Sequence, residues 1–230
     1  MNNVNKIAAV VVMMATASTS VLAESIDVRV IGTITPTACK PTLSGGGTID
    51  YGVITPKSLN KDSFTYLNVK NVDFSITCDA PAKLALQARS NRDGTALSLD
   101  GKMWQVARDL PLFGGTYDAH GLGLDSNNKG IGGFGLRFET ETITADSNKV
   151  DSIIKDNNGK WQKSPNGSLI KGAGIQRLYS WSKTGEVDPI AFTTLVGTLN
   201  VQAYINKSSE LDLTKPVKLD GLSTLELVYL

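Results

Sequence analysis

The chain contains only two cysteines and one histidine among its 230 residues, and this scarcity excludes several classes of site. Structural zinc sites use four Cys or His ligands, and three such residues do not supply them. The single histidine, His120, lies in a glycine-rich stretch beside Asp118 with no recognisable nucleophile elbow. A Ser–His–Asp triad needs a positioned base. We therefore expect no enzyme activity, no metal and no cofactor.

A weak calcium-loop pattern, Asp125-x-Asn127-x-Lys129-Gly130, also fails on chemical grounds. Lys129 places a cation where an oxygen ligand belongs, and no Glu follows at the twelfth position. We expect this stretch to form a hairpin turn.

The chain also lacks an excess of basic or acidic residues. The full chain has 23 basic and 22 acidic residues, and removal of the N-terminal segment described next takes away only Lys6, leaving 22 of each sign. A neutral balance provides no long-range attraction for nucleic acid or anionic lipid. We therefore expect no nucleic-acid partner.

One apolar run stands out, at the N-terminus, and it has the three parts of a secretory signal. Lys6 supplies positive charge, residues 7–15 (IAAVVVMMA) are apolar, and Ala23 is the small residue required for cleavage. Nine apolar residues cannot cross a bilayer of roughly 30 Å as a helix, and no later segment has the necessary length. Residues 1–23 are thus predicted to be removed, leaving 207 residues of an exported protein without a transmembrane segment.

Export places the two cysteines, Cys39 and Cys78, in an oxidising compartment, where an even count favours a disulfide. Closing a loop of about 40 residues would stabilise the fold by roughly 4 kcal/mol in the chain-entropy account. The alternative is a pair of free buried thiols.

The remaining sequence reads as short apolar-alternating segments between turn residues, with no sustained helical period. Such spacing favours an all-β antiparallel sandwich. The expected strands are residues 48–54, 71–77, 83–88, 175–181 and 195–205, with a further two-residue turn at Asn158-Gly159. Residues 114–135 contain eight glycines, a density that lets two backbones approach closely.

Both ends of the mature chain alternate with period two, as strands with one buried face do. The face of residues 24–34 carries Ile26, Val28, Val30, Gly32 and Ile34, and the last strand carries Leu225, Leu227 and Tyr229. Because a chain start is usually frayed and polar, the first segment is predicted to serve another molecule. The alternative is an ordinary first strand within its own sheet.

These features together resemble the subunits of chaperone–usher pili. In that family a glycine of the N-terminal extension precedes the first cysteine by a short spacer, and six residues separate Gly32 from Cys39. The second cysteine ends a strand of the type Phe-x-Ile, here Phe74 to Cys78 with a shorter spacer, and the chain ends with a penultimate tyrosine, Tyr229. The resemblance covers residues 24–90 and 190–230 and is greatest to a poorly characterised periplasmic group encoded near fimbrial operons. Residues 91–189 are longer than in a typical pilin.

The resemblance implies an incomplete immunoglobulin-like sandwich, residues 35–230 with an enlarged middle at 91–189, completed by a donated strand from a neighbouring subunit. Residues 24–34 would be the donor strand, with Ile26, Val28, Val30, Gly32 and Ile34 filling a groove. Leu225, Leu227 and Tyr229 would edge that groove and contact a periplasmic chaperone, which would also anchor the carboxylate of Leu230. An outer-membrane usher and neighbouring subunits would be the other partners, and the cell-surface pilus the final location.

The expected function is therefore that of a non-catalytic structural pilus subunit that supports adhesion. The competing interpretation is a self-contained secreted or periplasmic carbohydrate-binding sandwich. Aromatic side chains of the enlarged middle would stack on the sugar, and the five candidates are Trp104, Trp161, Trp181, Tyr117 and Tyr179. Such a domain would be a stable monomer, whereas a pilus subunit would need a chaperone.

Overall fold

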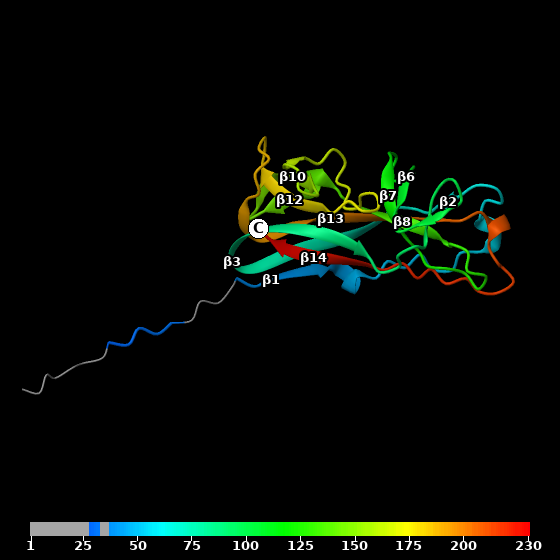
Figure 1. The fold of residues 1–230 in the computed structure, drawn as a ribbon, viewed down its shortest axis with the longest axis horizontal. Helices are drawn as coiled ribbons and strands as arrows, with labels where there is room; N and C mark the ends of the chain where they lie inside the picture. The colour runs from blue at the N-terminus through cyan, green and yellow to red at the C-terminus, as the bar shows by residue number, and fades with distance from the viewer. Residues whose placement is uncertain (1–27, 33–36) are drawn as a thin grey trace, which may run out of the picture. The chain divides into compact units, whose positions relative to one another are not determined.

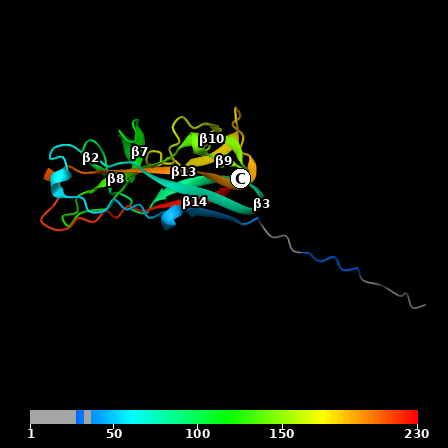
Figure 2. The ribbon, with the colours of Figure 1, turned by 180° about the vertical axis from the view of Figure 1, so that it is seen from behind.

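The computed structural model describes residues 28–32 and 37–230, and the chain divides into two compact units, Met1–Thr35 and Pro36–Leu230. The predicted signal peptide lies outside the described residues. The second unit is built from β-strands, with only short 3₁₀ turns besides (Figures 1 and 2). All strand pairs are antiparallel except a single parallel pair between β4 and β8. The predicted all-β antiparallel fold is confirmed.

The first seven strands are β1 (Cys39–Leu43), β2 (Thr65–Tyr66), β3 (Lys70–Ser90), β4 (Ala96–Leu97), β5 (Met103–Trp104), β6 (Ala107–Leu110) and β7 (Tyr117–Gly121). The other seven are β8 (Gly132–Phe138), β9 (Thr144–Ala145), β10 (Asn148–Asp156), β11 (Gln162–Lys163), β12 (Arg177–Lys183), β13 (Ala191–Ile205) and β14 (Ser223–Tyr229). The four 3₁₀ segments are η1 (Ser44–Gly47), η2 (Pro56–Ser58), η3 (Thr140–Thr142) and η4 (Ser208–Glu210).

Strand β3 belongs to both layers of the sandwich. Its first half pairs with β1 and β13, and its second half pairs with β12 and β14. Residues 70–78 alternate as expected and bury Val72, Phe74, Ile76 and Cys78, and they pair with β13 on one side and in part with β1 on the other. Residues 84–90 pair instead with β14, and Leu86 also pairs with Tyr179 of β12. Two strands were expected here, and the structure has one of 21 residues. Its register against β13 shifts beside Pro81, where a missing N–H is tolerated.

An aromatic core fills the space between the layers. Tyr179 and Trp181 of β12 contact Phe138 of β8 and Phe192 of β13, with ring centroids 5.2 to 6.1 Å apart. All four side chains are at most 1% exposed. Because β12 pairs with neither β8 nor β13, these contacts cross the interior between the layers. Large aromatic residues therefore provide most of the apolar packing at this point.

The glycine-rich region forms β7, β8 and their connection, and its backbones do approach closely. A Cβ on Gly133 would lie 2.6 Å from the carbonyl oxygen of His120 and 2.5 Å from the Tyr204 hydroxyl. A Cβ on Gly121 would lie 2.6 Å from the backbone nitrogen of Ala96. Side chains at these positions are excluded by contact with neighbouring backbone, so the glycines are needed for packing.

Two sequence-based expectations were wrong in detail. Residues 48–54 form no strand, because Asp50 Oδ1 accepts a hydrogen bond from Gly52 N and Gly52 has φ 67°, which turns the chain. The turn at Asn158-Gly159 is longer than two residues, since β10 ends at Asp156 and β11 begins at Gln162. By contrast, Asp125–Gly130 is a turn as expected, closed by a bridge between Leu124 and Gly130.

Candidate functional site

The last strand, β14, pairs with β3 along its whole length. Its ladder runs from Ser223 opposite Ser90 to Tyr229 opposite Leu84. Within residues 28–32 and 37–230, β3 is the only strand that pairs with β14. One edge of β14 is therefore hydrogen-bonded, and the backbone groups on its other edge are available to a further strand.

Strand β1 is in the same situation along the first half of β3. Its five residues pair with residues 74–78, and the predicted disulfide between Cys39 and Cys78 is formed, with directly opposite cysteines. No second strand of the described chain pairs with β1. The disulfide thus fixes a second strand that has a free edge.

Both free-edged strands pair with β3, and they approach each other at one end (Figures 1 and 2). Cys39 N, at the start of β1, donates a hydrogen bond of 2.9 Å to the hydroxyl of Tyr229, at the end of β14. The next residue, Leu230, donates its N–H to the carbonyl of Lys83 at 3.0 Å. These contacts hold one end of the pair together, although no ladder joins β1 and β14 in the described part of the chain.

Apolar side chains of both strands are only half-buried. Leu225 and Leu227 pack against the main core from β14, and Cys39 and Leu43 do so from β1. All four remain partly exposed, whereas the inward residues of β3 next to them are nearly fully buried. We use the word seam for the strip between β1 and β14 that these four residues border. A further strand laid there would remove apolar surface from water, worth about 25 cal/mol per Å².

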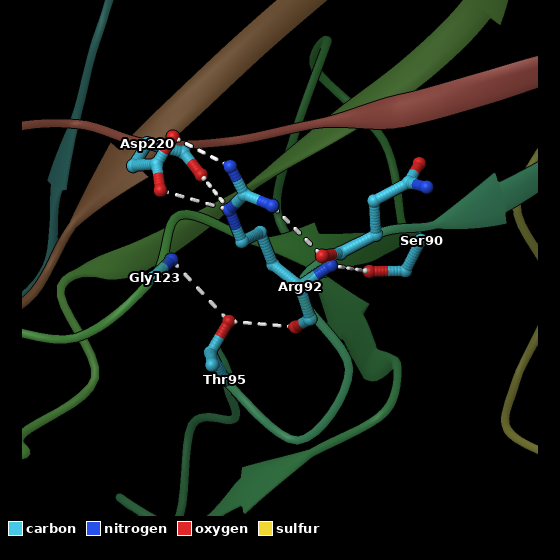
Figure 3. Close-up of polar contacts among 6 residues, drawn as sticks. Ser90, Arg92, Thr95, Gly123 and Asp220 are labelled. Atoms are coloured by element: carbon cyan, nitrogen blue, oxygen red, sulfur yellow. Dashed lines mark hydrogen bonds and ion pairs between the residues drawn. The ribbon is translucent and has the colours of Figure 1, made fainter.

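A polar clamp holds the chain just before β14 (Figure 3). The guanidinium of Arg92 makes a two-pronged contact with the carboxylate of Asp220, at 2.7 and 2.9 Å, and also bonds the Asp220 carbonyl. Thr95 accepts a hydrogen bond from Gly123 N and donates one to the Arg92 carbonyl, so the clamp reaches the glycine-rich connection. The hydrogen bonds from Arg92 lower the pKa of Asp220. The pair is solvent-exposed and contributes modestly to stability, but it orients the start of β14.

Of the predicted donor residues, Val28, Val30 and Gly32 are described, while Ile26 and Ile34 lie outside the described residues. Residues 28–32 have no regular secondary structure, and Val28 and Val30 are 86% and 92% exposed. A Cβ added to Gly32 would meet no described atom within 4 Å. The strand with which this segment pairs stays a prediction.

His120 lies in strand β7, within the glycine-rich stretch. It is 3% exposed, and its Nδ1 shares a hydrogen bond with the hydroxyl of Ser223, the first residue of β14. Burial lowers its pKa to about 4. The ring borders a pocket of about 220 Å³ that also involves Arg89 and Lys171. The histidine is therefore a neutral core residue that contacts β14, a role that no sequence pattern indicated.

The five aromatic candidates for sugar stacking do not form one platform. Trp181, Tyr179 and Tyr117 are at most 5% exposed and belong to the core. Trp104 of β5 is 50% exposed, and Trp161, before β11, is half-buried with Lys155 Nζ 5.2 Å from its ring centre. Three of the five side chains thus cannot stack on a ligand at the surface.

Side chains that could bind a metal ion do not cluster in the described residues. Among residues 28–32 and 37–230, no three His, Cys, Asp or Glu side chains gather where they could hold an ion. Asp125 Oδ1 instead accepts the backbone N–H groups of Asn127 and Lys129, as a turn residue does. No helix in this part of the chain is long and apolar enough to span a bilayer.

Comparison with known proteins places the chain in a family. A family model described as "Protein of unknown function (DUF1120)" matches residues 28–135. Protein GltF of Escherichia coli K12 is 34% identical over 236 aligned positions, which cover 94% of this chain and 91% of GltF. The uncharacterized protein YhcF of the same strain is 27% identical over 244 positions, covering all of both chains. This chain therefore belongs to the DUF1120 family and is homologous to GltF and YhcF.

Proposed function

We propose that this protein is a structural subunit of a bacterial surface pilus, in which the N-terminal segment of one subunit completes the sandwich of the next. The observation that carries the proposal is the seam, where β1 and β14 each pair with only one strand among the described residues and carry half-buried apolar side chains. Addition of an extended segment to such an edge is a known mode of recognition, and exchange between pilus subunits is one of its established examples.

The N-terminal segment supplies a matching occupant. Its apolar residues alternate over 24–34, as a strand with one buried face requires, and the described ones are largely exposed. Support comes from the seam and this segment alone, because the family description names no activity.

The donor strand would supply a large gross favourable free energy. Four aliphatic side chains, at roughly 1.5–3 kcal/mol each, and several backbone hydrogen bonds, at about 1 kcal/mol net each, give on the order of 10 kcal/mol before entropic costs. Without a donor, an apolar seam with free strand edges favours aggregation. A periplasmic chaperone would cover Leu225, Leu227 and Tyr229 and anchor the Leu230 carboxylate. At an outer-membrane usher, the chaperone would then be replaced by the donor strand of a neighbouring subunit. The pilus would be displayed at the cell surface.

The resemblance to the fimbrial-operon-associated periplasmic group is part of the same proposal. The alternative, a self-contained carbohydrate-binding sandwich, would place residues 24–34 in the domain's own sheet. It predicts a monomer whose stability does not depend on other copies. The two proposals therefore differ in the state of the isolated mature chain.

Replacing Gly32 with Leu should abolish assembly without affecting the subunit's own domain. The domain is spared because Gly32 belongs to a separate compact unit, Met1–Thr35, and not to the sandwich. Assembly is lost because the donor glycine is expected to face a part of the seam that has no room for a side chain. Mature protein refolded from denaturant is separated by size-exclusion chromatography, and we expect oligomers for the parent and monomers for Gly32→Leu.

The matched control is Arg29→Ala, which changes the opposite face of the same segment and should assemble like the parent. If Gly32→Leu formed the same oligomers as the parent, the proposed donor register would be wrong. A parent chain that stays monomeric and folded would support the self-contained alternative.

A further inference from the structure

The pocket that His120 borders lies where β3 and β12 separate. These two strands pair only at Leu86 and Tyr179, and beyond that point residues 87–90 and 171–175 line the pocket together with His120 of β7. Its volume of about 220 Å³ is below the roughly 300–1,000 Å³ of sites for drug-sized ligands. The pocket therefore suits a molecule of a few heavy atoms.

Two buried side chains offer unpartnered polar atoms to this pocket. His120 is 3% exposed, and its Nδ1 contacts the Ser223 hydroxyl, whereas its Nε2 has no hydrogen-bond partner in the described chain and is not sealed from solvent. Gln87 is 8% exposed, and its Oε1 accepts hydrogen bonds from Arg89 Nη2 at 3.2 Å and Gln176 Nε2 at 3.1 Å. The amide nitrogen of Gln87 is thus left to donate. Buried polar atoms are nearly always hydrogen-bonded, so these two are satisfied by whatever fills the pocket.

Donors outnumber acceptors among the other groups that line the pocket. Ser90 Oγ accepts the Arg92 N–H at 3.1 Å (Figure 3), which leaves its own proton free to donate. Three cationic side chains also line the pocket, namely Arg89, Lys171 and Arg177. Asp93 is the one acidic side chain among the lining residues that the structure describes. A ligand that accepts hydrogen bonds is therefore favoured.

The carboxylates that neutralise two of these cations lie outside the pocket lining. Arg89 contacts Glu226 at 2.7 Å, in a pair exposed to solvent and therefore weak. Arg177 contacts Asp156 through Nε and Nη2, so Nη1 is not used by this ion pair. Lys171 is exposed and has no ion-pair partner within residues 28–32 and 37–230. The positive ends thus meet at the pocket, where they favour an anion.

We propose that this pocket binds a small organic carboxylate, whose oxygens accept hydrogen bonds from Gln87, Lys171 and His120 Nε2. The Ser223 hydroxyl then donates to Nδ1, so that Nε2 carries the proton of the neutral ring. Apolar side chains also line the pocket and suit a short carbon chain, and the largest are Val106, Leu169 and Ile175. Binding here is separate from donor-strand exchange, because none of the four residues that border the seam lines the pocket.

Propionate and its uncharged isostere propionamide test the proposal. The full mature chain is titrated with each at pH 7 and matched ionic strength, with ligand-observed NMR as the readout. Propionate should bind with a millimolar dissociation constant, and propionamide about tenfold more weakly or less. Lys171→Met should weaken propionate binding about tenfold and leave the melting temperature unchanged, because Lys171 is exposed. His120→Asn keeps a polar atom for Ser223 but removes Nε2, and should weaken binding by a similar factor.

The matched control is Lys57→Met, which removes the same charge from an exposed lysine that does not line the pocket. This variant should bind propionate like the parent. The proposal is overturned if propionate does not bind at about 50 mM, well above a millimolar dissociation constant, or if propionamide binds as tightly. It is also overturned if Lys171→Met or His120→Asn binds propionate as well as the parent, or if inorganic phosphate binds more tightly than propionate.

Discussion

Replacing both Cys39 and Cys78 with serine should lower the free energy of unfolding by about 4 kcal/mol. The bond closes a loop with a sequence separation of 39, and its loss restores freedom to the unfolded chain. The folded side is affected too, since β1 pairs with β3 over five residues only and has no other strand partner in the described chain. Because domains are stable by about 5–15 kcal/mol, this is a large fraction of the total.

Urea unfolding of the parent and the double variant measures the difference, and the parent in excess reductant is the matched control. The double variant and the chemically reduced parent should unfold at similar urea concentrations. Both midpoints should be lower than that of the disulfide-bonded parent. A loss below about 1 kcal/mol would contradict the role assigned to the bond. Labelling of free thiols in the unreduced, denatured parent would contradict the bond itself.

Acid should destabilise the protein through His120, by about 3 kcal/mol between pH 6.5 and pH 4. The folded-state pKa is lowered from 6.5 to about 4 by burial, so in this window the unfolded chain binds a proton that the folded chain does not. Stability therefore rises with pH from about 4 to 6.5 and is flat above, by about 1.4 kcal/mol for each unit of pKa difference.

The comparison is His120→Asn against the parent, with chemical denaturation at pH 4, 5, 6 and 7. The variant should lose the parent's slope with pH, whatever its absolute stability. Ser223→Ala is the control, because it removes the hydrogen-bond partner of His120 and leaves the titrating ring, and its slope should persist. An unchanged slope in His120→Asn would show that another group causes the acid sensitivity.

Much of the fold could be predicted from the sequence, because short local sequence patterns indicate it. Period-two alternation found residues 71–77, 83–88, 195–205 and the last strand, and export with two cysteines predicted the disulfide. The glycine density of residues 114–135 indicated close backbone contact, which Gly133 and Gly121 make. In each case the signal lies within a few residues or in a single pair.

The remaining features depend on contacts between distant parts of the chain. Arg92 and Asp220 are 128 positions apart, and His120 and Ser223 are 103 apart, with no motif linking either pair. Residues 48–54 alternated like a strand, yet the Asp50–Gly52 turn overrode the pattern.

The central claim is that the seam accepts residues 24–34 of another copy. Binding of a peptide of residues 24–36 to a chain that lacks this segment tests the claim most directly. A mature chain lacking residues 24–34 is melted with and without a peptide of residues 24–36, and with the same peptide carrying Gly32→Leu. A donor that binds only the folded state should add about 4 kcal/mol at a thousandfold excess over its Kd, which raises the melting temperature by roughly 10 °C. The Gly32→Leu peptide should raise it by far less. If the truncated chain ignored both peptides while the full mature chain remained a heat-stable monomer, the seam would not be a strand-acceptor site.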